Sequence, residues 1–184
     1  MNKRNVFLVG FMGTGKTTIG RELAKMMGRK FQDLDAELEK RLGKSVAEYF
    51  AEHGEAHFRE QEELVAIQLA ATNNRVIATG GGTILNPRIY EALHSSGLLV
   101  CLYTHRDDLV DRLKRNDRRP LVRGQSEKEI TAKVDTLLQE RSEKYGRVKV
   151  RIDTSDLTPM AAARKIFELV ALQTRILQEP IDLS

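Results

Sequence analysis

The chain has 184 residues, of which 41% are hydrophobic and 30% charged, with a formal net charge of +4. This length is typical of one domain with a real core, and the composition excludes a disordered or collagen-like protein. No apolar run approaches the roughly 18 residues of a membrane-spanning helix, and a single cysteine, Cys101, excludes an intrachain disulfide. We therefore predict one soluble domain over residues 1–184, located in the cytoplasm and without a membrane partner.

Apolar runs and amphipathic segments alternate along the chain, which predicts an α/β fold: a five-stranded parallel sheet with helices on both faces. Strands are expected at residues 6–9, 30–33, 75–79, 98–103 and 149–152. Helices are expected at residues 16–27, 35–41, 46–52, 55–71, 87–94, 107–115, 127–144 and 159–177. Capping boxes at residues 45–48 and 126–129 indicate two helix starts, and we expect residues 178–184 to fray.

The first strand leads directly into the loop Gly10-Phe11-Met12-Gly13-Thr14-Gly15-Lys16-Thr17. This run matches the pattern G-x-x-x-x-G-K-[ST], and a strand, loop and helix in this order allow backbone N–H groups to bind phosphates. Lys16 can follow the β- and γ-phosphates, and the hydroxyl of Thr17 can bind magnesium. The alternative is a glycine-rich turn that contains Gly-Lys-Thr by chance. The loop predicts binding of a nucleoside triphosphate.

The second strand is expected to end in Asp33-Leu34-Asp35, with strand alternation placing both carboxylates on one face. At the carboxyl edge of the sheet, Asp33 could support a hydrated magnesium near Thr17, and Asp35 could orient an acceptor hydroxyl. Alternatively, the pair only caps the next helix. More residues separate the second and third strands than a crossover needs, so residues 34–62 are predicted to form a small substrate-binding subdomain.

Three consecutive glycines, Gly80-Gly81-Gly82, follow the third strand. They would let the backbone approach a ligand closely and present its amides, or they form an ordinary tight turn. Arg59 and Arg141 lie within predicted helices, where an arginine most often faces solvent. If the fold brings the two together, they could grip one carboxylate.

The segment at residues 112–123 is strongly basic. Such a segment is usually a solvated face, and a nucleic-acid site is the next interpretation. No aromatic residue is interleaved with it, so bases would find no aromatic side chain to stack on. We predict instead a mobile lid at residues 114–126, from which an arginine reaches the transferred phosphoryl group.

Taken together, these motifs resemble the shikimate kinases over roughly residues 5–170. The motifs, in chain order, are the phosphate loop, Asp33-Leu34-Asp35, Phe58-Arg59-x-x-Glu62, Gly80-Gly81-Gly82, Arg119-Pro120-Leu121, Arg141-x-x-x-Tyr145 and Ile152-Asp153-Thr154. The resemblance implies a P-loop kinase fold of the nucleoside monophosphate kinase type. It also implies ATP-dependent phosphorylation of the 3-hydroxyl of shikimate, giving shikimate 3-phosphate and ADP, in chorismate and aromatic amino-acid biosynthesis.

The same resemblance implies a role for each motif residue. The residues implied to bind ATP are Met12, Gly13, Thr14, Gly15, Lys16, Thr17, Thr18, Arg112, Arg119 and Leu157, with Arg112 stacked on adenine. Those implied to bind shikimate are Asp35, Arg59, Gly80, Gly81, Gly82 and Arg141, with the two arginines on its carboxylate. Thr17 and Asp33 are implied for Mg²⁺, and Lys16, Asp35 and Arg119 for catalysis. In one departure, the family often has Arg-x-Pro-Leu-Tyr where this chain has Arg141-Ser142-Glu143-Lys144-Tyr145.

Two other functions fit part of the pattern. A gluconate-type sugar-acid kinase would use the same ATP site and would also bind a carboxylate with neighbouring hydroxyls. A nucleotide-dependent nucleic-acid-binding module would account for the basic segment and the positive net charge. The combined motifs favour a monomeric enzyme that binds shikimate, ATP and Mg²⁺ and does not bind nucleic acid.

Overall fold

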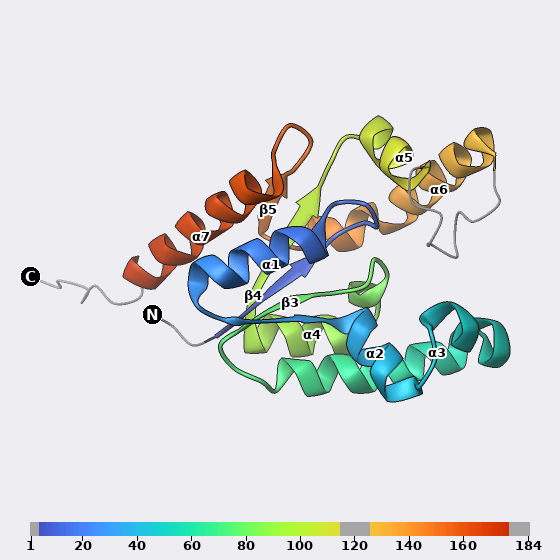
Figure 1. Ribbon diagram of the computed structural model, residues 1–184, viewed down its shortest axis with the longest axis horizontal. Coiled ribbons are helices and arrows are strands. Elements are labelled where there is room, and N and C mark those ends of the chain that lie inside the picture. The colour runs from blue at the N-terminus through green and yellow to red at the C-terminus, as the bar shows by residue number, and fades with distance from the viewer. Residues whose placement is uncertain (1–3, 115–125, 177–184) are drawn as a thin grey trace, which may run out of the picture.

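The computed structural model describes residues 4–114 and 126–176, and these contain a five-stranded parallel sheet (Figure 1). Its strands are β1 (Asn5–Val9), β2 (Lys30–Asp33), β3 (Arg75–Ala78), β4 (Gly97–Tyr103) and β5 (Val150–Asp153). They lie in the order β2-β3-β1-β4-β5, and every pairing is parallel. The predicted sheet is therefore confirmed, with each strand boundary within one residue of the prediction.

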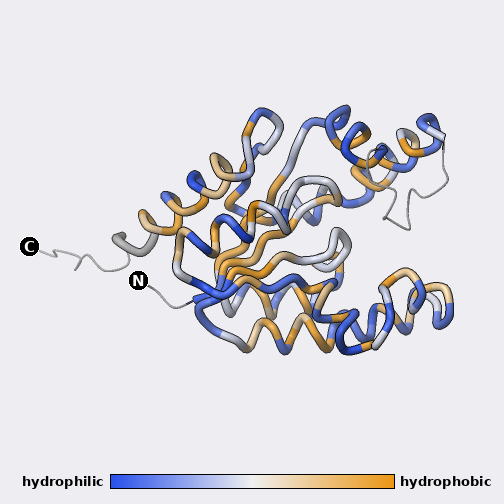
Figure 2. The backbone as a smooth tube through the Cα atoms, in the orientation of Figure 1, coloured by the Kyte–Doolittle hydropathy of each residue, from blue (hydrophilic) through white to orange (hydrophobic). Residues whose placement is uncertain are grey.

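Alternate side chains of the central strand β1 enter two separate cores. Val6 and Leu8 pack with residues of α1 (Lys16–Met27) and α7 (Pro159–Ile176). Phe7 and Val9 pack on the other face, with residues of α3 (Val46–Ala70) and α4 (Pro87–Ser96). Because helices cover both faces, the inner strands β1 and β4 are apolar at nearly every position, and Figure 2 shows a hydrophobic centre there. The edge strands β2 and β5 also carry polar and charged residues. Helices on both faces are thus confirmed.

The remaining helices are α2 (Leu34–Leu42), the 3₁₀ helix η1 (Thr83–Leu85), α5 (Arg106–Lys114) and α6 (Glu127–Gly146). Both predicted capping boxes are formed, at Ser45 and at Ser126. The two helices predicted at residues 46–52 and 55–71 are joined in one element, α3. Gly54 interrupts it with φ 76° and ψ 176°, a backbone conformation that glycine adopts without a Cβ clash.

Parallel strands bring the candidate site to one edge of the sheet. β1 leads into the phosphate loop, β2 ends at Asp33, β3 is followed by Gly80, and Thr154 follows β5. All four segments leave the carboxyl ends of their strands, which is where open α/β sheets bind ligands. Among the described helices, none combines the length and the apolar composition needed to cross a membrane.

Candidate active site

The phosphate loop between β1 and α1 depends on glycine backbone conformations. Gly13 and Gly15 both have φ +87°, and Gly10 has φ +133°. A Cβ on Gly10 would lie only 2.1 Å from the carbonyl oxygen of Leu102, so no other residue fits there without movement of the backbone. Gly15 is the N-cap of α1 and provides no side-chain cap. The first N–H groups of this helix are therefore positioned to bind an anion.

Lys16 folds back over the loop that precedes it. Its ammonium donates hydrogen bonds to the carbonyl oxygens of Gly10 (2.8 Å) and Phe11 (2.9 Å), and the residue is only 9% exposed. The buried hydroxyl of Thr14 also donates to the carbonyl of Phe11, at 2.8 Å. The loop thus surrounds a nearly buried positive charge, which suits it to hold phosphates.

Asp33 connects the strand β2, the helix α2 and the phosphate loop. Its Oδ1 accepts a hydrogen bond from the backbone N–H of Asp35 (3.1 Å), and its Oδ2 accepts one from the hydroxyl of Thr17 (2.7 Å). The prediction that strand alternation aligns the two carboxylates is therefore wrong, because β2 ends at Asp33 and Asp35 lies in the first turn of α2. An aspartate that accepts from a backbone N–H favours a helix start at this point. Asp33 therefore caps α2 with one carboxylate oxygen and contacts Thr17 with the other.

The pair of Thr17 and Asp33 suits a magnesium ion. Both offer oxygen atoms, which this hard cation prefers, and they lie beside the phosphate loop. Magnesium keeps several water ligands and shares phosphate oxygens, so it needs only one or two protein groups. This fits the described residues, in which no group of three or more His, Cys, Asp or Glu side chains is arranged to hold a metal.

Asp35 faces the triple glycine from α2. A Cβ on Gly80 would lie 3.1 Å from Oδ1 of Asp35 and 3.3 Å from Oε1 of Glu62, so a larger residue at Gly80 would press on both carboxylates. Asp35 as a whole is an exposed residue, but its carboxyl group points inward against Gly80. Burial, with the charges of Asp33 and Glu62, raises the pKa of Asp35 to about 6, while Lys16 opposes this shift.

The other two glycines of the loop contact the two predicted arginines. A Cβ on Gly82 would lie 3.1 Å from Nη2 of Arg59. A Cβ on Gly81 would lie 3.3 Å from the backbone nitrogen of Met12 and 3.6 Å from Nη1 of Arg141. The loop therefore lies close to Asp35, Arg59 and Arg141 and also to the phosphate loop.

Arg59 is held by two glutamates of its own helix. Its Nη1 donates to Oε2 of Glu62 at 2.6 Å, and its Nε and Nη2 contact Glu55. Glu62 is 2% exposed and also accepts a hydrogen bond from the hydroxyl of Thr83, at 2.7 Å. Glu62 is not among the residues that the sequence predicts for the site, although its i,i+3 spacing from Arg59 is a signal for this pair. No sequence signal pointed to Thr83.

Arg141 does not face solvent. Only 9% of it is exposed, its Nη1 donates to the carbonyl of Gly81 (3.3 Å), and its guanidinium lies over the ring of Phe11 at 5.7 Å. Arg59 and Arg141 therefore border the same glycine loop from α3 and α6. The fold brings the two arginines to one place, despite the departure in the residues that follow Arg141.

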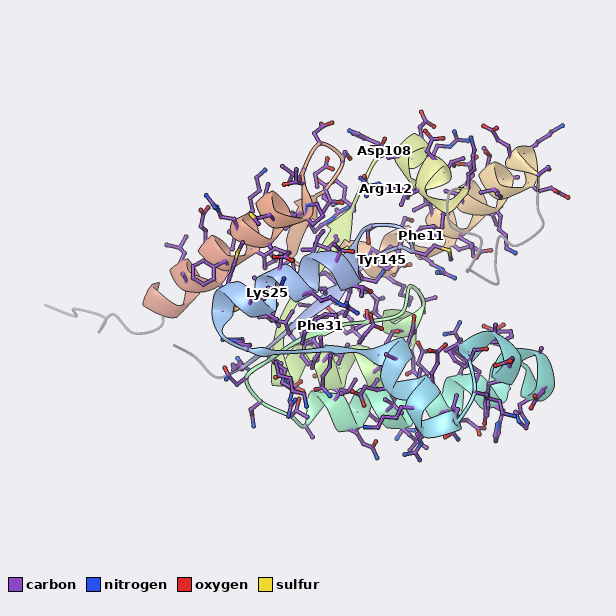
Figure 3. The ribbon with its side chains drawn as sticks, in the orientation of Figure 1. Phe11, Lys25, Phe31, Asp108, Arg112 and Tyr145 are labelled. Atoms are coloured by element: carbon purple, nitrogen blue, oxygen red, sulfur yellow. The ribbon has the colours of Figure 1, made fainter. Side chains whose placement is uncertain are left out.

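A third group of residues lies on the other side of the phosphate loop. Arg112, from α5, donates to the carbonyls of Gly13 (3.3 Å) and Thr154 (3.4 Å), and the Thr154 hydroxyl contacts the carbonyl of Thr14 (3.4 Å). Figure 3 labels Arg112 and Phe11 near this loop. Leu157 is partly buried beside the core between the sheet, α1 and α7.

Two of the predicted features fall outside this geometry. Arg119 and nearly all of the predicted lid lie outside the described residues. Thr18 is exposed on α1, where with Thr17 it lines an open groove.

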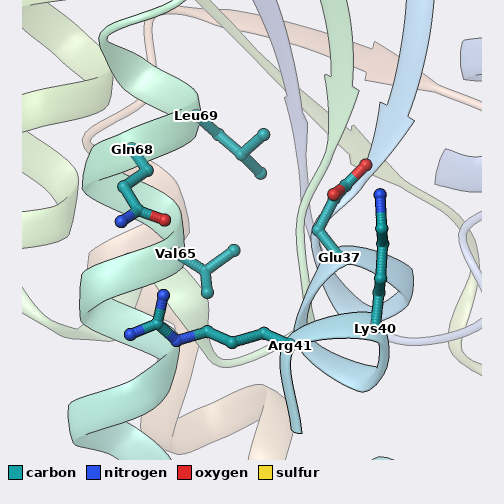
Figure 4. Close-up of a pocket in the computed structure, with 6 residues that line it drawn as sticks. All are labelled: Glu37, Lys40, Arg41, Val65, Gln68 and Leu69. Carbon is teal, nitrogen blue, oxygen red and sulfur yellow. The ribbon is translucent and has the colours of Figure 1, made fainter. Parts of the chain in front are cut away.

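A separate hollow of about 280 Å³ between α2 and α3 (Figure 4) is lined by none of the predicted site residues. Its lining residues are Glu37, Lys40, Arg41, Val65, Gln68 and Leu69.

A parallel sheet in this order, with a glycine-rich phosphate loop between β1 and α1, defines a P-loop kinase. The family model of shikimate kinase matches residues 12–171. A shikimate kinase of Pelotomaculum thermopropionicum is 40% identical over 168 residues, which cover 91% of this chain and 95% of that protein. The chain belongs to the shikimate kinase family.

Solved structures agree with this assignment. The shikimate kinase of Acinetobacter baumannii in complex with shikimate is 37% identical and superposes with a TM-score of 0.86, covering 93% of this chain and 94% of that chain. The shikimate kinase of Bacteroides thetaiotaomicron is 32% identical, with a TM-score of 0.87, covering 91% and 98%. The predicted fold class is confirmed by both neighbours.

Proposed function

We propose that this protein transfers the γ-phosphoryl group of ATP to the 3-hydroxyl of shikimate, giving shikimate 3-phosphate and ADP in chorismate and aromatic amino-acid biosynthesis. The observation that carries the proposal is the convergence of Asp35, Arg59 and Arg141 on one glycine loop, which itself touches the phosphate loop at Met12. This arrangement provides a carboxylate-binding pair and a hydroxyl-binding carboxylate next to a site for phosphates. Family membership supports the same reaction.

On the donor side, the backbone of Met12, Gly13, Thr14, Gly15, Lys16, Thr17 and Thr18 would bind the phosphates of ATP. Lys16 would move its charge from the loop carbonyls to the β- and γ-phosphates. Arg112 would stack on adenine, with Leu157 completing that pocket. Thr17 and Asp33 would hold magnesium, which when bound withdraws electron density from the phosphate oxygens.

On the acceptor side, Arg59 and Arg141 would bind the carboxylate of shikimate, because a guanidinium offers paired donors to a carboxylate. Asp35 and the amides of the triple glycine (Gly80, Gly81 and Gly82) would bind its hydroxyls. A carboxylate with a pKa of about 6 is still far too weak a base to ionise an alcohol before attack. Asp35 therefore orients the hydroxyl and accepts its proton late, as the new oxygen–phosphorus bond forms and the bond to ADP breaks.

The proposal treats residues 34–62 as the acceptor-binding part of a single domain. This segment contains α2 and about the first two-thirds of α3, and supplies Asp35 and Arg59. We further propose that the protein is a cytoplasmic monomer. The free, buried Cys101 supports the cytoplasmic location, because it suits a reducing compartment. Light scattering of the purified protein measures its mass in solution and so tests whether it is a monomer.

A coupled assay of ADP release tests the function. We expect release that depends on shikimate and Mg²⁺, with little release when gluconate or a nucleoside monophosphate replaces shikimate. Absence of shikimate-dependent ADP release would overturn the proposal. Release with gluconate alone would instead identify a sugar-acid kinase.

A further inference from the structure

Tyr145 lies in the last turn of α6, one turn after Arg141, and its hydroxyl reaches the glycine loop. The hydroxyl donates a hydrogen bond to the carbonyl oxygen of Gly81 at 2.5 Å. The residue is 7% exposed, and burial raises the pKa of Tyr145 to about 12. The hydroxyl therefore keeps its proton at any pH at which the protein would work. Arg141 donates to the same carbonyl (3.3 Å), so two side chains of α6 hold one oxygen atom.

This carbonyl controls the direction of a neighbouring N–H group. The C=O of Gly81 and the N–H of Gly82 belong to one planar trans peptide, so they point in nearly opposite directions. Holding the carbonyl against α6 therefore turns the Gly82 N–H away from α6. Without such a restraint, consecutive glycines rotate easily between several backbone conformations.

The Gly82 N–H is available to a ligand. Within the loop, the N–H of Thr83 donates to Gly80 (3.4 Å) and the N–H of Leu85 donates to the carbonyl of Gly82 (3.0 Å). No hydrogen bond among the described residues uses the Gly82 N–H itself. Since Gly82 also lies against Nη2 of Arg59, this donor is beside the proposed carboxylate-binding group.

We propose that Tyr145 is a positioning residue for the acceptor: its hydroxyl fixes the Gly81–Gly82 peptide, and so presents the Gly82 N–H beside Arg59. The inference rests on the proposed function, in that the acceptor binds at this loop. Tyr145 acts through the backbone of the loop and not by contact with the reacting atoms. This role explains the Arg-x-x-x-Tyr spacing, because residues four apart lie on one face of a helix and both reach the carbonyl of Gly81.

Tyr145→Phe tests the inference, because it removes only the hydroxyl and keeps the ring in the core on this face of the sheet. Tyr90→Phe is a matched control, since the hydroxyl of Tyr90 contacts the carbonyl of Arg147 at 3.5 Å, away from the loop. For Tyr145→Phe we expect KM for shikimate to rise about five- to tenfold, the size of one lost hydrogen bond. KM for ATP should stay close to wild type, and the thermal midpoint should fall by no more than a few degrees, the effect of one buried hydrogen bond. Tyr90→Phe should change none of the three.

Amide hydrogen exchange of the ligand-free protein provides a readout that does not depend on turnover. We expect faster exchange at residues 80–82 in Tyr145→Phe, and unchanged exchange there in Tyr90→Phe. An unchanged KM for shikimate in Tyr145→Phe would overturn the inference. So would an equal rise in both KM values with a lowered thermal midpoint, because that result indicates a general structural role. If the wild-type protein releases no ADP with shikimate, the proposed function fails first, and exchange at residues 80–82 still decides whether the hydroxyl fixes the loop.

Discussion

The donor and acceptor halves of the site both use glycine, but for different reasons. In the phosphate loop, Gly10, Gly13 and Gly15 have positive φ values that side chains rarely adopt. None of the three glycines after β3 has a positive φ, and there the missing Cβ leaves room for Asp35, Arg59 and Arg141. Glycine therefore shapes the backbone in the donor half and makes space for side chains in the acceptor half. The phosphate loop is one contiguous segment, whereas the acceptor residues come from α2, α3, α6 and the loop after β3.

The largest expected effect is on the acceptor half, from Asp35→Asn. An amide cannot accept the proton, so we expect kcat to fall about 10²- to 10⁴-fold, the usual contribution of general acid–base catalysis. Binding of ATP should change little, because Asp35 belongs to the other half. Steady-state kinetics together with a nucleotide-binding titration measure the two effects, and near-normal turnover would remove Asp35 from its role.

Arg59→Ala should mainly weaken acceptor binding. Loss of one member of a desolvated charge pair costs about 2–5 kcal/mol, and it also leaves Glu62 buried without its cation. The matched control is Arg88→Ala, since Arg88 on α4 pairs with Glu63 at 2.9 Å, outside residues 34–62. The KM values for shikimate and for ATP are compared in both variants. An unchanged KM for shikimate in Arg59→Ala would exclude Arg59 from the acceptor site.

Alanine substitutions at glycines test the comparison of the two halves directly. Gly10→Ala should destabilise the fold by at least about 2 kcal/mol, since it combines a strained φ with a backbone overlap. Gly82→Ala should change stability by less than about 1 kcal/mol but raise KM for shikimate, because the methyl group meets only the end of the Arg59 side chain and no backbone atom. Gly146→Ala is the control, since no atom lies within 4 Å of its Cβ position. Denaturant unfolding measures the stability of each variant, and steady-state kinetics measure its KM for shikimate. Equal changes of both quantities in Gly10→Ala and Gly82→Ala would contradict the comparison.

The smallest expected effect is a pH-dependent gain in stability from Asp35→Asn. The pKa of Asp35 is raised from 3.8 to about 6 in the folded protein, so the folded state binds this proton more tightly than the unfolded state. The protonated carboxyl group of Asp35 therefore adds to the free energy of unfolding below pH 3.8. This contribution is lost as the pH rises to about 6. Asparagine does not titrate, so the variant should unfold at a higher temperature than wild type at pH 7.5 and lose that advantage near pH 4. An equal difference in thermal midpoint at both pH values would refute this assignment.

The sequence predicted the parts of the molecule whose causes are local. Alternating apolar runs predicted all five strands, and the glycine pattern predicted the phosphate loop. The sequence-based prediction failed where a side chain ends the strand. Asp33 caps α2, so Asp35 lies in a helix and not in the continuation of β2. Periodicity is also uninformative for three-residue elements such as η1, which carries Thr83. The network that joins Arg59 to the buried Glu62 and Thr83 needs the packing of α3 against this turn, which no local pattern contains.

The order of the strands separates the phosphate loop from the helices that supply Asp35 and Arg59. β1, which leads into the phosphate loop, has a neighbour on each side, whereas β2 lies at the edge and pairs only with β3. The helices that supply Asp35 and Arg59 are inserted between β2 and β3, outside the connection from β1 to α1. During evolution, such an insertion can be replaced while the donor site stays intact. One ATP-binding scaffold can thereby give rise to kinases for chemically different alcohols.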